Sequence, residues 1–292
     1  MLLAGLALTV GSAFATNLGF LLRHRGAVDA PEVDVRRPLR SVAGLFRQKC
    51  WTIGYAVAAV AYGLHVGGLA LAPLSLVQAV LAGGLVLLGV IAERWFGFDL
   101  GRREWTGVVL AAAGLAFLTL TSAGETGGDS SDYSLAAMLA WESALVGIGT
   151  VLILMHRTDR WESRRGILLG LAAGLLFTVS HVAVKAATGS ADALAAAPFV
   201  VLTVLAGVGA FFASARSLQL GEGVAVIAVT SIAGNASSIP AGIVVFGDPL
   251  GEGPASIVVR SLAFVLVVVA AAMIPGPTRS PRPRAATEAA PA

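Results

Sequence analysis

The sequence is poor in charge and in cysteine. Only 13% of its 292 residues are Asp, Glu, Lys or Arg, whereas 57% are hydrophobic. Soluble domains average about 25% charged and about 45–50% apolar residues, so this composition excludes an ordinary soluble domain. The single cysteine, Cys50, excludes an internal disulfide. No GxxxxGKS/T loop, HExxH motif or paired acids occur, so we expect neither a nucleotide-driven pump nor an enzyme, and no cofactor.

The apolar residues are gathered into nine long stretches. An α-helix needs about 20 residues to cross a hydrocarbon core about 30 Å thick, and each stretch is close to that length. The sequence therefore predicts an all-α polytopic membrane protein with nine transmembrane helices. The stretches are residues 2–22, 51–71, 74–93, 105–122, 135–155, 166–187, 198–215, 223–246 and 255–274.

Basic residues lie in every second gap between these stretches. Of the 20 Lys and Arg residues, 18 lie in the odd-numbered gaps or after the last stretch, and the even-numbered gaps hold none. Short loops rich in Arg and Lys stay in the cytoplasm, which predicts an N-terminus outside and a cytoplasmic C-terminus. The preference for Arg over Lys is typical of a GC-rich bacterial genome, so we expect a multi-pass protein of the bacterial inner (plasma) membrane.

A weak internal repeat relates the second, third and fourth stretches to the seventh, eighth and ninth. Residues 69–73 correspond to residues 218–222, and Glu93 corresponds to residues 246–248. The third stretch ends inside and the eighth ends outside, so the two units have opposite orientations. Inverted repeats are the architecture of alternating-access transporters, whose substrate site lies where the repeats meet.

Three short motifs carry a family resemblance. They are Leu-Ala-Pro-Leu-Ser-Leu-Val-Gln at 71–78 with Glu93, Arg-Glu-Trp-Thr-Gly at 103–107 leading into Ala-Ala-Ala-Gly-Leu at 111–115, and Gly-Phe-Leu-Leu-Arg-His-Arg-Gly at 19–26. With these the chain resembles the drug/metabolite transporter (DMT) superfamily of EamA-like proteins. Its helix count is similar to that of the NIPA-type magnesium transporters.

The resemblance implies a 4+5 inverted repeat, in which the first unit has lost one helix. The first unit then spans residues 2–122 with a cytoplasmic loop at 23–49, the second spans 135–275, and 276–292 is a disordered cytoplasmic tail. The implied function is secondary transport of a small solute by alternating access through a central polar cavity. The alternative is NIPA-like transport of magnesium or another divalent cation. The NIPA pattern has an acidic residue and an asparagine where this sequence has Tyr62 and His65.

Five ionisable residues lie inside predicted membrane helices, all in the outer half. An ionisable group in hydrocarbon is costly, so it is expected to be paired or functional. One interpretation is a structural ion pair of the acid with a neighbouring cation, and the other is a gate or proton-coupling site. The residues are Glu142, His181, Lys185, Arg260 and His65.

Polar residues that could line a central cavity lie on the first, third and eighth stretches. The eighth stretch leads into Pro240, and a helix interrupted by Gly and Pro can open its carbonyls toward a cavity. The alternative is a kinked helix whose hydroxyls bond its own carbonyls. The cavity-lining candidates are Asn17, Gln78, Ser231, Asn235 and Ser238.

Two further features concern packing and partners. Gly166, Gly170 and Gly174 form a stripe of small residues, and Gly63 and Gly67 form a pair, which marks faces for close helix contact. Residues 37–48 form either a solvated basic loop or a short amphipathic helix on the inner surface. We expect membrane lipids and a small-molecule or cation substrate as partners, no nucleic acid, and either a monomer or a homodimer.

Overall fold

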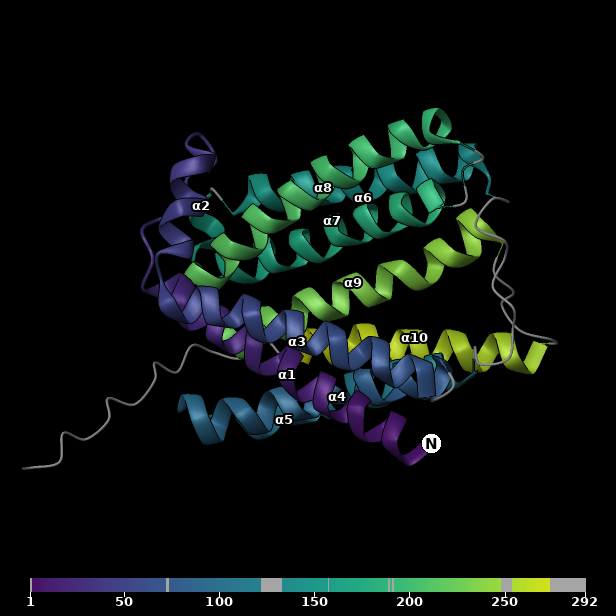
Figure 1. The fold of residues 1–292 in the computed structure, drawn as a ribbon, viewed down its shortest axis with the longest axis horizontal. Coiled ribbons are helices and arrows are strands. Elements are labelled where there is room, and N and C mark those ends of the chain that lie inside the picture. The colour runs from purple at the N-terminus through teal and green to yellow at the C-terminus, as the bar shows by residue number, and fades with distance from the viewer. Residues whose placement is uncertain are drawn as a thin grey trace, which may run out of the picture.

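The protein is described by a computed structural model that places residues 2–71, 74–121, 133–156, 158–188, 190, 192–247 and 254–273. The described residues form long helices that run side by side, with one short helix across their ends (Figure 1). The helices are α1 (Leu2–Val28), α2 (Pro38–Phe46), α3 (Lys49–Leu71), α4 (Leu74–Phe96), α5 (Arg102–Thr121), α6 (Leu135–Met155), the 3-10 helix η1 (Asp159–Arg164), α7 (Arg165–Thr188), α8 (Ala193–Leu220), α9 (Gly223–Phe246) and α10 (Pro254–Met273).

In the part of the chain that the structure describes, each predicted apolar stretch lies on one long helix; the last residues of two stretches, 122 and 274, lie outside it. Over the described residues, six helices are long and apolar enough to cross a membrane, namely α1, α3, α6, α7, α8 and α9. The count of nine spans therefore stays a prediction. The predicted tail at 276–292 lies outside the described residues.

Two helix ends differ from the prediction for local reasons. Helix α8 begins at Ala193, well before Pro198, because Oδ1 of Asp192 accepts hydrogen bonds from the N–H groups of Leu194 (2.9 Å) and Ala195 (2.8 Å). This is an N-cap, which satisfies donors that a helix start leaves unpaired. Segment 23–49 contains the last turns of α1 and the whole of α2, so the helical alternative for residues 37–48 holds over Pro38–Phe46.

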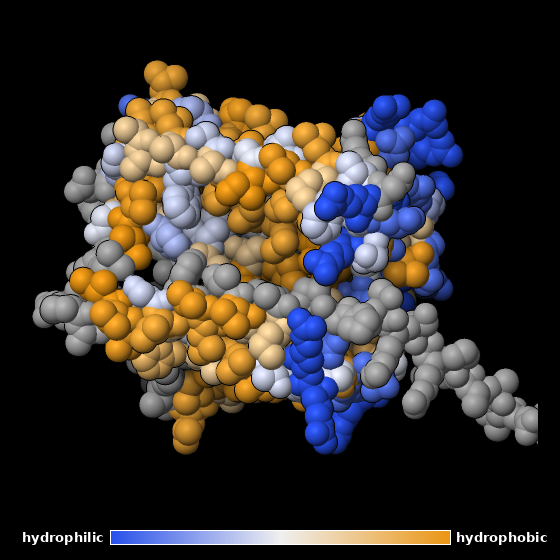
Figure 2. All heavy atoms as spheres, turned by 180° about the vertical axis from the view of Figure 1, so that it is seen from behind, coloured by the Kyte–Doolittle hydropathy of each residue, from blue (hydrophilic) through white to orange (hydrophobic). Residues whose placement is uncertain are grey.

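The surface has the pattern of a membrane protein. Figure 2 shows hydrophilic residues gathered at one end of the molecule, while much of the remaining visible face is apolar. Large hydrophobic side chains such as Leu194, Leu205 and Leu262 are more than half exposed. Soluble monomers rarely expose this much apolar surface, and lipid is the environment that suits it.

The helices pack as two groups joined by α9 and by a contact between α1 and α8. Helix α1 lies along α3 and packs on α4, and α7 lies along α8 and packs on α9, so the two predicted units have matching neighbours. Helix α10 packs mainly on α5, and α9 contacts α1, α4, α5 and α10. In Figure 1, α9 runs between the layer of α6, α7 and α8 and the layer of α1, α3, α4, α5 and α10.

The glycine stripe on α7 is a packing face, as predicted. A Cβ built on Gly174 would lie 2.5 Å from the Thr230 carbonyl oxygen and 2.9 Å from the Gly234 amide nitrogen, both on α9. Gly166 is equally close to the backbone of Gly221. Gly63 differs from expectation, because a Cβ there would meet nothing within 4 Å.

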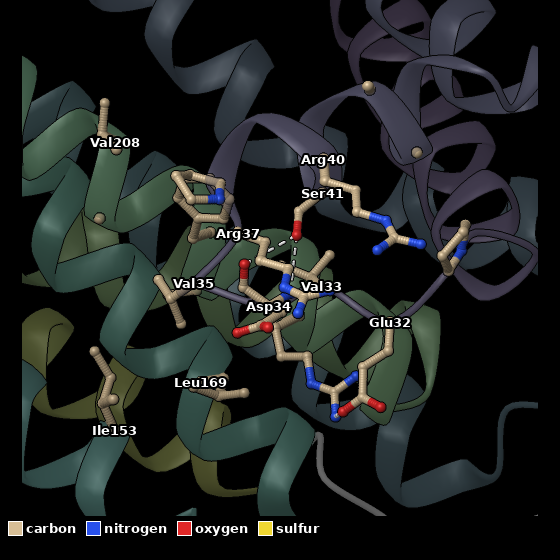
Figure 3. Close-up of a pocket in the computed structure, with 18 of the residues that line it drawn as sticks. Glu32, Val33, Asp34, Val35, Arg37, Arg40, Ser41, Ile153, Leu169 and Val208 are labelled. Atoms are coloured by element: carbon tan, nitrogen blue, oxygen red, sulfur yellow. Dashed lines mark hydrogen bonds and ion pairs between the residues drawn. The ribbon is translucent and has the colours of Figure 1, made fainter.

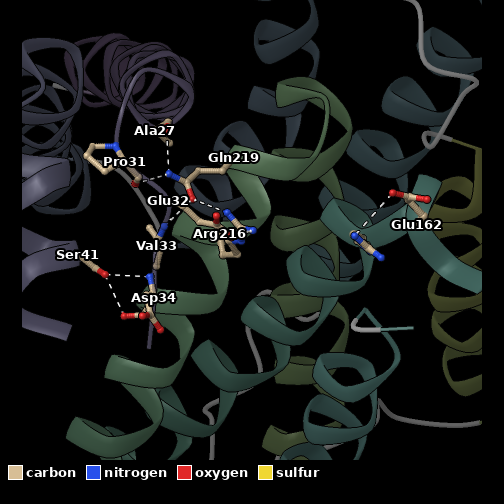
Figure 4. A network of polar contacts seen from close by, with 10 residues as sticks. Ala27, Pro31, Glu32, Val33, Asp34, Ser41, Glu162, Arg216 and Gln219 are labelled. Atoms are coloured by element: carbon tan, nitrogen blue, oxygen red, sulfur yellow. Dashed lines mark hydrogen bonds and ion pairs between the residues drawn. The ribbon is translucent and has the colours of Figure 1, made fainter. Parts of the chain in front are cut away.

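A glutamine at the end of α8 ties the two groups together at the hydrophilic end. Gln219 donates from Nε2 to the carbonyls of Ala27 (3.1 Å) and Pro31 (3.0 Å), and its Oε1 accepts from the Val33 amide (3.0 Å) (Figure 4). Arg216 also donates to Gln219 and forms an ion pair with Glu32. One side chain thereby fixes the chain between α1 and α2 against α8.

Candidate functional site

The cavity-lining candidates lie on three helices that contact one another where the two groups meet. Helices α1, α4 and α9 each contact the other two. The candidates are Asn17 on α1, Gln78 on α4, and Ser231, Asn235 and Ser238 on α9. The side chain of Gln78 lies outside the described residues.

Asn17 holds α1 against α4. Its side chain is buried, and Nδ2 donates to the carbonyl oxygens of Ala13 and Gly84, both at 2.8 Å. The Ala13 carbonyl lies one turn earlier in the same helix, whereas the Gly84 carbonyl lies on α4. The close approach favours a glycine, because a Cβ on Gly84 would lie 3.0 Å from the Cβ of Ala13, which is tighter than an ordinary contact.

A threonine that the sequence analysis did not identify makes the corresponding contact between α7 and α9. Oγ1 of Thr178 donates to the Gly234 carbonyl (2.9 Å) and lies 2.7 Å from Oγ of Ser237. Thr178 is fully buried. A single threonine in an apolar helix gives no signal by itself, because its hydroxyl can always bond to its own helix.

The two contacts occupy matching positions. Asn17 lies fifteen residues after the start of α1, and Thr178 lies thirteen after the start of α7. Gly84 lies ten residues into α4, and Gly234 lies eleven into α9. All four residues therefore lie near the middle of their helices. In both contacts a polar side chain, on α1 or α7, bonds to the carbonyl of a glycine, on α4 or α9.

The remaining polar groups of α9 mostly bond within their own helix. Ser238 donates to the Gly234 carbonyl (2.7 Å), and Asn235 donates to the Ser231 carbonyl (2.8 Å). This local bonding is the alternative that the sequence left open. The side chain of Asn235 is nevertheless exposed, so its amide remains accessible. A cavity-lining role for these residues stays a prediction.

The expected pairing of Glu142 with a neighbouring cation is not seen among the described side chains. Glu142, on α6, is 5% exposed, and its Oε1 has no hydrogen-bond partner. Nζ of Lys185 instead lies 4.0 Å from the centre of the Phe246 ring, a cation–π contact. His181 is exposed, and its ring stacks on Phe177. Glu142 is thus a buried carboxyl group with an unsatisfied oxygen.

The other two ionisable candidates lie apart from Glu142. His65 is on α3, which packs on α1, α2 and α4, and its Nδ1 is buried without a hydrogen-bond partner. Arg260 is on α10, and its side chain lies outside the described residues. Within the part of the chain that the structure describes, no group of three or more His, Cys, Asp and Glu side chains could hold a metal ion.

The sequence is similar to a probable magnesium transporter, NIPA9, of Arabidopsis thaliana. The two are 24% identical over 287 residues, which cover 92% of this chain and 81% of the plant protein. No family model matches the sequence, and no solved structure matches it. The similarity supports the NIPA-like resemblance and a membrane transporter rather than an enzyme. The wider DMT assignment stays a prediction.

Proposed function

We propose that this chain is a secondary transporter of the DMT/EamA-like type that moves a small solute by alternating access. The observation that carries the proposal is the matched pair of contacts, Asn17 to Gly84 and Thr178 to Gly234. Equivalent contacts in two units support an inverted-repeat transporter, whose solute site lies near the middle of the membrane where the repeats meet. The proposed architecture is nine spans in a 4+5 arrangement.

Each contact is weak enough to open during a transport cycle. A neutral hydrogen bond contributes about 0.5–1.5 kcal/mol net, so thermal motion can break one contact while the other holds. Both are formed in this structure. Rocking α1 and α3 against α4 would then expose the junction to one side of the membrane, and rocking α7 and α8 against α9 would expose it to the other.

Magnesium is the second candidate for the solute, because of the similarity to the probable magnesium transporter. Magnesium keeps several of its waters and is usually bound through one or two carboxylates. A single buried carboxyl group, Glu142, is compatible with a hydrated ion, although the described residues hold no preformed cage. If a proton drives transport, Glu142 is the proposed coupling group.

The proposed orientation places the hydrophilic end of Figure 2 in the cytoplasm, with the N-terminus outside. Arg23, Arg40 and Arg216 lie toward this end, as the charge rule for cytoplasmic loops requires. The proposed location is the plasma membrane.

Uptake by proteoliposomes tests the substrate. The purified protein is reconstituted, and magnesium entry is followed with an encapsulated dye, with and without a pH gradient. If magnesium is the solute, we expect saturable entry above that of empty liposomes. No magnesium entry from folded protein would contradict the magnesium assignment, and the search would then turn to organic solutes exchanged for protons.

A further inference from the structure

A hollow of about 1440 Å³ lies at the hydrophilic end, between α2 with the chain before it and helices α6, α7 and α8 (Figure 3). Its floor is apolar and is formed by Ile153 on α6, Leu169 on α7, and Val208 and Phe212 on α8. Its rim is polar and is formed mainly by residues of segment 31–48. The hollow therefore combines an apolar floor, which forms its wall, with a polar and charged rim, which forms its mouth.

The hollow closes toward the middle of the membrane. There, Leu145 of α6, Val179 of α7 and Ala206 of α8 pack in one buried cluster. Along α8 the hollow extends from Arg216 to Leu205, which at 1.5 Å per residue is about 16 Å. This is about half of a hydrocarbon core about 30 Å thick, which is the length of one leaflet.

The apolar wall is open to lipid. Leu205 is 66% exposed and Val208 is 51% exposed, and both belong to a run of exposed apolar residues on α8 that includes Val201 and Val204. A chain lying in the hollow would thus be continuous with the surrounding acyl chains. A water-soluble ligand would gain nothing from this wall.

The mouth carries an excess of positive charge. Arg37, Arg40 and Arg47 line it and are exposed, and Arg216 also lines it but is paired with Glu32. Asp34 is the other acidic residue of the lining. Helix α2 lies across the ends of the long helices, as expected for a helix at a membrane surface (Figure 1).

We propose that this hollow binds one anionic phospholipid of the adjacent leaflet. The acyl chains lie along Ile153, Leu169 and Val208, and the phosphate lies at Arg37, Arg40 and Arg47. Basic pockets between membrane helices are suited to anionic headgroups, whereas the 16 Å apolar wall requires a ligand with chains. The proposal does not depend on which solute is transported.

Lipid titration of the detergent-purified protein tests this site. Binding of dioleoyl-phosphatidylglycerol is followed by native mass spectrometry and by the melting temperature. Dioleoyl-phosphatidylcholine and glycerophosphoglycerol, which lacks chains, are the comparators. We expect one saturable phosphatidylglycerol site and at least about tenfold weaker binding of both comparators. Equal binding of phosphatidylcholine would contradict the proposed preference for an anionic headgroup. Equal binding of the chain-free headgroup would contradict the proposal that the ligand is a lipid.

Two sets of variants locate the site. Each arginine near a membrane surface contributes about 1 kcal/mol, or about fivefold, so the triple change Arg37→Gln, Arg40→Gln, Arg47→Gln should weaken binding about 100-fold. The matched control is Arg94→Gln, Arg102→Gln, Arg103→Gln, which removes the same charge from exposed positions at the end of α4 and the start of α5. An equal loss in the control would refute the site.

A plug in the apolar wall gives an independent test. Val208→Trp fills the hollow from an exposed position, so we expect folding to persist, as judged by size-exclusion chromatography. Phosphatidylglycerol binding should fall at least about tenfold, since the chains lose their place. Unchanged binding in this variant would show that the lipid lies elsewhere.

Discussion

Glu142→Gln should lower the transport rate at least about tenfold, equivalent to about 1.4 kcal/mol of barrier. Glu142 is buried, and Oε1 has no hydrogen-bond partner among the described residues. A carboxyl group that is costly to bury and is not used to hold helices together is expected to act in transport. Glutamine has the same shape but carries no negative charge and exchanges no proton, so it would bind a divalent cation much more weakly than a carboxylate does.

The same change should leave the fold intact. Removing an ionisable group from a buried site removes its desolvation cost, so we expect an unchanged or higher melting temperature. If Glu142 couples transport to protons, the pH dependence of the rate should disappear as well. The assay is uptake by proteoliposomes across a range of pH.

A matched control for this prediction is Glu162→Gln. Glu162 is exposed and lies 3.8 Å from Arg165 across one helical turn, an arrangement that contributes little. We expect normal transport from this variant. Normal transport from folded Glu142→Gln would contradict the role of Glu142, and a parallel loss of folded protein would assign it a structural role.

Gly174→Val should strongly reduce the yield of folded protein. The new Cβ would lie 2.5 Å from the Thr230 carbonyl and 2.9 Å from the Gly234 amide, and neither backbone atom can move without its helix. Overpacking of this kind costs about 1–3 kcal/mol. Parting α7 from α9 would also break the Thr178 to Gly234 hydrogen bond nearby.

Gly147→Val provides the comparison, because a Cβ on Gly147 would meet nothing within 4 Å. Both changes add the same side chain to a long helix, so they differ in the contact alone. Size-exclusion chromatography and the melting temperature in detergent measure the effect. A similar loss of folded protein in both variants would mean that the destabilisation comes from the helix propensity of valine and not from the α7–α9 contact.

The sequence predicted the positions of the helices well, because long apolar runs and the gaps between them are directly readable. It predicted their ends less well. The start of α8 depends on the side chain of Asp192, which caps the helix. Helix α1 continues beyond its apolar stretch through a segment that contains arginines. Both helix ends are set by local interactions, which the hydropathy of the sequence does not reveal.

The candidate site was likewise predicted in part. Asn17 was predicted to line a cavity, as a polar residue in an apolar stretch; in the structure its amide donates to the carbonyl of Gly84. Thr178 was missed, and the pairing expected for Glu142 was not found, because the depth of a residue along a helix does not give the direction its side chain faces. The partner of Lys185 proved to include an aromatic ring, Phe246.

The most direct test of alternating access is to lock α1 to α4 and measure magnesium uptake. A Cβ on Gly84 would lie 3.0 Å from that of Ala13, slightly under the roughly 3.5–4.5 Å of a disulfide, so Ala13→Cys with Gly84→Cys in a Cys50→Ser background should cross-link with a small shift. Oxidation should stop uptake and reduction should restore it, whereas oxidation should not change uptake by either single cysteine variant relative to its own reduced form. Equal uptake by the cross-linked and reduced protein would contradict the account, because α1 and α4 would then never part.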